Sequence, residues 1–133
     1  DPKLEKTAGI FTTFPAFPNY PFSGLFDQVL GTALLLFLVL VVLRHAPGWF
    51  QPALIGLVVV AIGVAFGAMH GYAINPARDF GPRLFVTLAG FVNNGLTDGS
   101  GVWWVPIVGP LIGGPLGALA YGRLVDPYLP GRS

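Results

Sequence analysis

The sequence contains no cysteine, and only 10% of its 133 residues are charged. The absence of cysteine excludes disulfide frameworks, thiolate chemistry and sulfur-ligated zinc, and it leaves the redox compartment open. With a net charge of +1, the chain offers neither a basic face for nucleic acid nor an acidic face for a basic partner. No basic segment followed by an apolar run stands at the start, so no signal peptide is predicted. Because the chain begins with Asp1 and Pro2, we interpret it as a piece of a longer polypeptide.

Apolar side chains are abundant. They make up 53% of the chain, and the mean hydropathy is +0.70. This balance is typical of a protein that lies in a lipid bilayer. Three apolar runs are each long enough to cross a hydrocarbon core of about 30 Å. We therefore predict an all-α membrane protein with transmembrane helices at residues 24–43, 52–69 and 103–125.

The basic residues near the ends of these runs predict an orientation. Arg44 follows the first run, and Arg123 and Arg132 follow the third. Three crossings place both positions on the same side, which the positive-inside rule makes cytoplasmic. Residues 126–133 are then a cytoplasmic tail, and residues 1–23 are an extracellular loop whose prolines argue against regular structure.

Glycine recurs in the second and third runs at the spacing that lets helices pack closely. Gly63 and Gly67 are four residues apart, as are Gly109, Gly113 and Gly117. Small residues at this interval allow helix backbones to approach one another in membranes. We expect close helix contacts at both sets.

Residues 70–102 connect the second and third runs and include the stretch "HGYAINPARDFGPRLF". Asn75 is a good helix cap, and Pro76 suits the first helical position. The predicted helix, residues 76–90, is too short to span a bilayer. It is either a re-entrant half-helix or an ordinary helix of an extracellular loop. If it is re-entrant, the extended residues before it survive in the bilayer only where they line water or are buried, so their carbonyls face a pore.

The charges of this segment separate into two groups. Arg78 lies in the first turn, where the helix dipole and free amides already give positive potential, so it is expected to repel protons and cations. Asp79 and Arg83 stand in the favourable i, i+4 order and are expected to support the half-helix. Asp27 is interpreted as a helix-start acid or interhelical partner, and His70 as an interfacial side chain of the connecting loop.

The segment "GYAINPARDFGPRLF" resembles the second signature of the major intrinsic protein family, the aquaporins and glycerol facilitators. The order span, span, half-helix, span resembles one repeat of that family from Gly24 to Val125. The resemblance implies an aquaporin-like right-handed helical bundle of two inverted repeats, each with one N-P-A half-helix. This chain, with one N-P-A motif, is similar to the C-terminal repeat. The missing N-terminal repeat of the same protein is therefore an expected partner.

The resemblance also implies roles for individual residues. Asn75, with Pro76 and Ala77, forms the N-P-A motif, and its side-chain amide donates a hydrogen bond to a passing solute. Arg78 is the arginine of a narrow filter, and Tyr72 is the aromatic filter residue of the glycerol-conducting branch.

Other positions extend the resemblance to that branch. Carbonyls of Gly71 and Ala73, with that of Tyr72, form an acceptor ladder. Gly63 stands where water-selective members carry a histidine, which leaves room for a carbon skeleton. Asp79 with Arg83 also resembles the glycerol branch.

These features predict a passive channel for glycerol, small polyols and water, built as a homotetramer in the plasma or inner membrane. We expect no cofactor, no metal site and no enzymatic activity, because no activated nucleophile or paired carboxylates are present. Two alternatives stay open. The protein is a mainly water-selective channel, or it is part of an ion-coupled secondary transporter that uses Asp27 or Asp79.

Overall fold

The computed structural model describes residues 1–129, so Arg132 and the end of the predicted tail lie outside it. Within these residues the fold is helical and contains no strand. The prediction of an all-α fold with three long apolar helices and one shorter helix is confirmed. The helices are α1 (Pro21–His45), α2 (Gln51–His70), α3 (Pro76–Leu88) and α4 (Val105–Leu124), with 3-10 turns η1 (Thr7–Ile10), η2 (Val102–Trp104) and η3 (Asp126–Tyr128).

Three of these helical stretches are long and apolar enough to cross a membrane. They are Phe22–His45, Gln51–His70 and Val102–Tyr128. Helix α3, at 13 residues, is too short to span a bilayer, as expected. It ends two residues before its predicted end, and α1 begins three residues before its predicted start.

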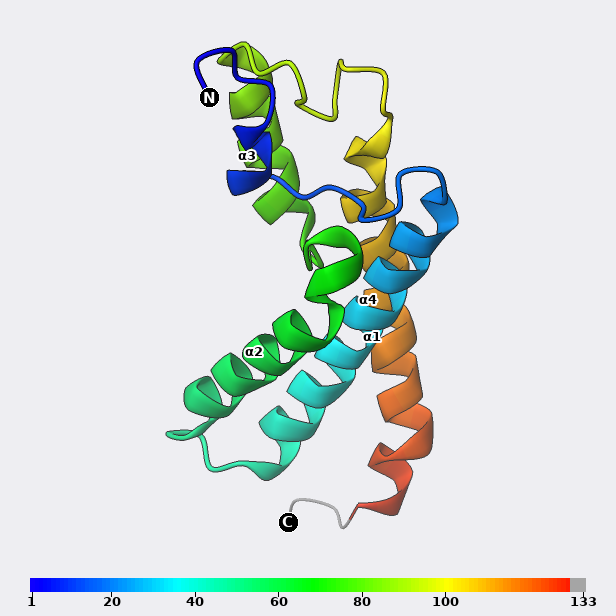
Figure 1. Ribbon diagram of the computed structural model, residues 1–133. Helices are drawn as coiled ribbons and strands as arrows, with labels where there is room; N and C mark the ends of the chain where they lie inside the picture. Colours follow the sequence, from blue (N-terminus) through cyan, green and yellow to red (C-terminus); the bar gives the residue numbers. More distant parts are fainter. Residues whose placement is uncertain (130–133) are drawn as a thin grey trace.

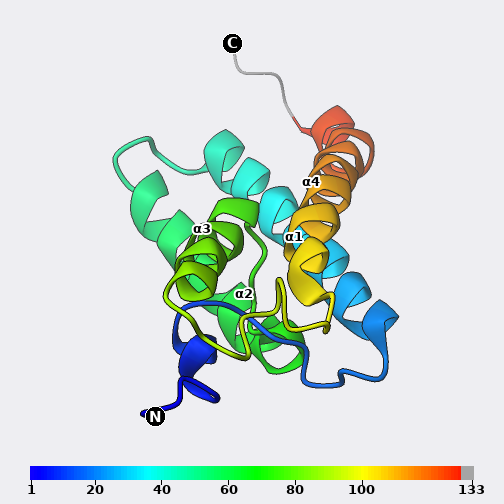
Figure 2. The ribbon, with the colours of Figure 1, turned by 90° about the horizontal axis from the view of Figure 1, so that it is seen from above.

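Helices α1 and α4 cross each other in close contact (Figures 1 and 2). The glycines of α4 make this contact possible, because a Cβ at Gly113 would overlap the carbonyl oxygen of Val29 and one at Gly117 would overlap that of Ala33. The close packing expected of these α4 glycines is confirmed. Within residues 1–129, by contrast, a Cβ at Gly67 in α2 would meet no atom within 4 Å.

Helix α3 begins near the middle of the molecule, beside the end of α2, and runs toward the end at which residue 1 lies (Figure 1). The N-terminal segment packs against it: the ring of Phe11 lies 5.9 Å from the rings of both Phe85 and Phe91. Figure 2 shows the following residues crossing from the side of α3 to the start of α1. The segment predicted to lack regular structure therefore includes η1 and is held in place by tertiary contacts.

The interpretation of His70 as an interfacial side chain of the connecting loop is wrong. It is the last residue of α2, and only 1% of it is exposed. The helix continues to this point because the residue that reverses the chain is Gly71, whose φ of 59° is left-handed and suits glycine.

Candidate functional site

The start of α3 is fixed by its own cap. The side-chain oxygen of Asn75 accepts hydrogen bonds from the amides of Ala77 (2.9 Å) and Arg78 (3.2 Å). The side-chain amide of Asn75 donates no hydrogen bond within residues 1–129, and the residue is exposed. A free donor therefore stands at the positive end of the helix dipole.

The segment before α3 has an unusual backbone. Gly71, Tyr72 and Ile74 have φ values of 59°, 43° and 38°. Residues other than glycine rarely adopt this left-handed region. The segment is held by Gln28 of α1, whose Oε1 accepts a 2.6 Å hydrogen bond from the Ile74 amide. The carbonyls of Gly71, Tyr72 and Ala73 accept no hydrogen bond within the described residues. They are available to a ligand.

Sequence reasoning missed Gln28. It is fully buried and donates through Nε2 to Asp27 at 3.0 Å, so Asp27 is a partner of its neighbour rather than of another helix. The available signal was two adjacent polar residues within an apolar run. Only the fold shows that Gln28 reaches the segment before α3, which is 46 residues away in the sequence.

Two cavities meet at Arg78. The first, which we call the Asn75 cavity, has a volume of about 230 Å³ and is lined by residues 72–75, Leu35, Val59 and Arg78. The second, the Thr13 cavity, has about 330 Å³ and is lined by residues that include Thr12, Thr13, Gly67, Gly71 and Arg78. Arg78 is the residue that borders both cavities within residues 1–129.

Tyr72 packs against both Arg78 and Gly63. The guanidinium carbon of Arg78 lies 5.6 Å from the centre of the Tyr72 ring, a cation–π distance. A Cβ at Gly63 would lie 3.3 Å from ring atoms of Tyr72. The room that Gly63 leaves is thus taken by the tyrosine ring, and Gly63 does not itself line either cavity.

Asp79 and Arg83 form a buried, two-pronged ion pair with no exposed surface. Arg83 donates from Nε to Oδ2 of Asp79 at 2.8 Å and from a terminal nitrogen to Oδ1 at 2.9 Å. Asp79 also accepts from the amide and hydroxyl of Thr13 at 2.8 and 2.7 Å. Arg83 donates further to the carbonyls of Thr13 (2.7 Å) and Asn94 (3.0 Å). The pair therefore joins α3 to two segments that the sequence did not connect to it.

The loop after α3 is shaped around this arginine. A Cβ at Gly95 would overlap a terminal nitrogen of Arg83. Asp98 accepts hydrogen bonds from the Gly95 amide (2.7 Å) and from the amide (2.9 Å) and hydroxyl (2.7 Å) of Ser100. Partial burial acts to raise the pKa of Asp98, but these hydrogen bonds and the charge of Arg83 outweigh it and hold that pKa below its ordinary value.

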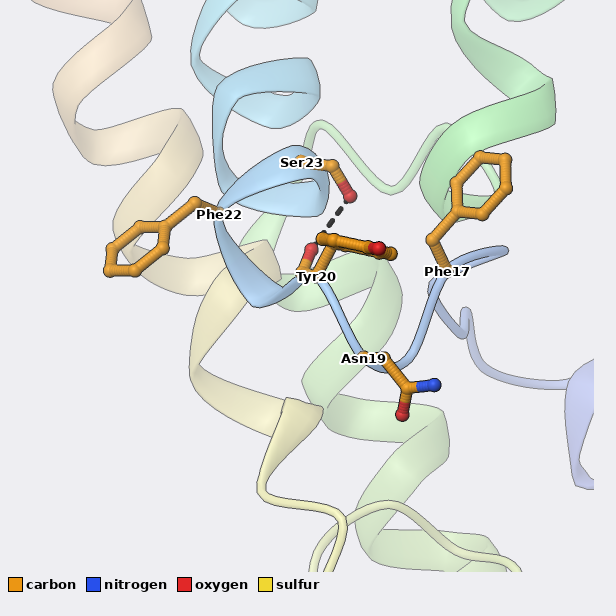
Figure 3. Close-up of a pocket in the computed structure, with 5 residues that line it drawn as sticks. All are labelled: Phe17, Asn19, Tyr20, Phe22 and Ser23. Atoms are coloured by element: carbon orange, nitrogen blue, oxygen red, sulfur yellow. Dashed lines mark hydrogen bonds between the residues drawn. The ribbon is translucent and has the colours of Figure 1, made fainter.

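A further cavity lies away from these residues, at the start of α1. It has a volume of about 420 Å³ and is lined by Phe17, Asn19, Tyr20, Phe22 and Ser23. Figure 3 shows Phe17 and Phe22 on opposite sides of Tyr20, and the Ser23 hydroxyl donating to the Tyr20 carbonyl at 2.7 Å. Aromatic residues at the end of an apolar span are typical of the membrane interface. We assign this cavity no part in the site.

Within residues 1–129, no three His, Asp or Glu side chains gather where they could hold a metal ion. The polar groups of the site are instead a free amide, a guanidinium, a phenol and unpaired carbonyls. This set can exchange hydrogen bonds with a small neutral solute.

The family model described as Major intrinsic protein matches residues 7–121. The chain belongs to the major intrinsic protein family. The resemblance carried by residues 71–85 is thereby confirmed, and the N-P-A motif lies at the cap of α3, as in the half-helix that the resemblance implied.

Relatives of this major intrinsic protein chain include proteins named for glycerol. It is 40% identical to human aquaporin-10 over 95% of the chain and 43% of the relative. It is 39% identical to the glycerol uptake facilitator protein of Escherichia coli strain K12 over 92% of the chain and 46% of that protein. The solved structure of the aquaglyceroporin from Plasmodium falciparum matches with a TM-score of 0.81 at 25% identity, covering 91% of this chain and 52% of that one. The chain spans somewhat less than half the length of these two curated relatives.

Proposed function

We propose that the full-length protein that contains this chain is a passive membrane channel for glycerol, other small uncharged solutes and water. The observation that carries the proposal is that Arg78 lines both the Asn75 and Thr13 cavities and lies against the ring of Tyr72. This arrangement offers donors on one wall and an aromatic surface beside them. Glycerol, with hydroxyls along one edge and carbon along the other, matches such a wall.

Each polar group has a distinct part in this proposal. The free amide of Asn75 donates to the solute, and the unpaired carbonyls of Gly71, Tyr72 and Ala73 accept from it. The guanidinium of Arg78 donates to the solute and, with the positive end of α3, disfavours cations. No carboxylate within residues 1–129 forms a salt bridge with Arg78, so its charge is not paired with an acid there.

Gly63 acts indirectly. By lacking a side chain it lets the ring of Tyr72 lie against α2, which keeps that ring out of the centre of the Asn75 cavity. The pair Asp79 and Arg83 supports the half-helix and also ties the N-terminal segment to it.

The remaining part of the channel belongs to the other half of the protein. We propose that this chain is the C-terminal repeat, that an N-terminal repeat with its own N-P-A half-helix faces Asn75, and that four subunits assemble in the plasma or inner membrane. Residues 1–20 then lie outside, and Arg44 and Arg123 lie in the cytoplasm, consistent with the positive-inside rule.

The hydrogen bonds of Asp27 and Asp79, the two acids that could bind a coupling ion, disfavour an ion-coupled transporter. Asp27 is hydrogen-bonded to Gln28, and Asp79 is engaged by Arg83 and Thr13. Neither carboxylate is free to bind a transported cation. Nothing in the site supplies a nucleophile or a paired acid and base, so we propose no enzymatic reaction.

The test is solute flux through vesicles that carry the full-length protein. In an inward glycerol gradient, light scattering should report re-swelling faster than in empty vesicles, without saturation and without an ion gradient. Equal rates in the two preparations would refute the proposal. Water flux without glycerol flux would favour a water-selective channel, and uptake that requires an ion gradient would favour coupled transport.

A further inference from the structure

His70 is a polar residue that the proposed solute pathway does not use. It lies at the end of α2, directly before Gly71, and is 99% buried, since only 1% of it is exposed. Its Nδ1 lies over Gly24 of α1, where an added Cβ would come within 2.6 Å. Neither ring nitrogen has a hydrogen-bond partner within the described residues. A neutral imidazole carries one donor and one acceptor, so both capacities are unmet.

Beside His70 is a small cavity. Its volume is about 40 Å³, and its wall includes Pro15, Ser100, Gly101 and Val105 as well as His70. It is separate from the Asn75 and Thr13 cavities, neither of which His70 lines. Ser100 and Gly101 bring a hydroxyl oxygen and main-chain groups to the same space. An unpaired, buried imidazole and further polar groups therefore line the same small space.

We propose that this cavity is a binding site for internal water, held by a hydrogen bond to the imidazole of His70 and by the polar groups of Ser100 and Gly101. A cavity needs about 10–15 Å³ to hold one water, and the water needs two to four polar partners. The cavity beside His70 is larger than this minimum, and His70, Ser100 and Gly101 supply the polar groups. Its volume suits one or a few waters and is too small for a polyol.

The water links two elements that no direct hydrogen bond joins. On one side is the end of α2, which leads into Gly71 and the left-handed Tyr72. On the other is the turn at Ser100 and Gly101 that leads into η2 and α4. A buried imidazole left unpaired would cost free energy, and the water removes that cost while it fixes the position from which the segment before α3 departs.

X-ray hydroxyl-radical footprinting of the full-length protein tests this. Radiolysis of a bound internal water oxidises the side chains beside it even where bulk solvent cannot reach. Val105, which lines the cavity and is 3% exposed, should be oxidised, whereas Val86 of α3, which is fully buried elsewhere, should not. After rapid mixing with water enriched in oxygen-18, label should reach Val105 more slowly than exposed Tyr128.

Two variants connect the water to His70. His70→Phe keeps a ring but has no hydrogen-bonding group, so oxidation of Val105 should fall to the level of Val86. His70→Gln keeps a donor and an acceptor and should retain it. The inference would be overturned if, in the wild-type protein, Val105 were no more oxidised than Val86 or acquired oxygen-18 as fast as Tyr128. It would also be overturned if a folded His70→Phe variant showed unchanged oxidation of Val105. If His70→Phe does not fold, the wild-type comparison alone decides.

Discussion

The buried pair of Asp79 and Arg83 allows a quantitative prediction. Replacing Arg83 with methionine keeps most of the volume but removes four hydrogen bonds: two to Asp79, one to the Asn94 carbonyl and one to the Thr13 carbonyl. The Asp79 carboxylate then stays fully buried with Thr13 as its remaining partner. Removing one member of a buried ion pair costs about 3–5 kcal/mol, because the other charge is left uncompensated.

Two comparisons separate the charge effect from simple loss of packing. Thr13→Val removes the hydrogen bond from the Thr13 hydroxyl to the Asp79 carboxylate and keeps the one from the Thr13 backbone amide. It should therefore lower the free energy of unfolding by about 1.5–3 kcal/mol. The double variant Asp79→Leu with Arg83→Met leaves no buried charge. It should cost less than the sum of Asp79→Leu and Arg83→Met measured singly.

The assay is unfolding of the full-length protein in detergent micelles, with Arg123→Met as the matched control. Arg123 is exposed near the end of α4, and its replacement should change the free energy of unfolding by less than about 0.5 kcal/mol. The reasoning fails if Arg83→Met costs no more than Arg123→Met, or if the costs of the two single variants add fully in the double variant.

Three further predictions concern other parts of the chain. Gly63→Ala forces the ring of Tyr72 to move by a few tenths of an ångström, so vesicle assays should find a larger loss of glycerol flux than of water flux; equal losses would contradict our placement of the ring. Because the pKa of Asp98 is lowered in the folded state, its stabilisation is complete above its ordinary pKa near 3.8 and is lost as the pH falls through the lowered value. The protection factors of residues 95–100 against hydrogen exchange should therefore fall in acid, and Asp98→Asn should remove that dependence. Gly117→Ala, whose Cβ would overlap the backbone of α1, should lower thermal stability in detergent far more than Gly122→Ala, whose Cβ meets nothing within 4 Å; similar losses would argue against the α1–α4 contact.

The sequence predicted much of the fold because membrane spans leave a strong signal. Unbroken apolar runs marked α1, α2 and α4, and the Asn75 and Pro76 pair marked the start of α3. The boundaries were less certain. His70 was assigned to a loop because a histidine and a glycine normally end an apolar run, whereas the helix continues until the left-handed Gly71.

The site was predicted in its motif but not in its surroundings. The cap at Asn75 was predicted from local sequence and is confirmed, whereas the proposed roles of Asn75 and Arg78 toward a solute come from the family resemblance. Gln28 and Thr13 were missed, since each acts through a contact more than 40 residues away and neither belongs to a local pattern. Asp79 and Arg83 were paired correctly by their spacing, but the spacing says nothing of the loops that they hold.

By itself the sequence determined the class of the protein, its helical spans and the position of the N-P-A motif. Those features depend on hydrophobicity and on local capping, which act over a few turns of helix. Only the tertiary structure decided that Tyr72 fills the space over Gly63, that Arg78 lines two cavities, and that His70 lines a third. Such features depend on how segments far apart in the chain pack against one another. The sequence of a single segment does not determine that packing.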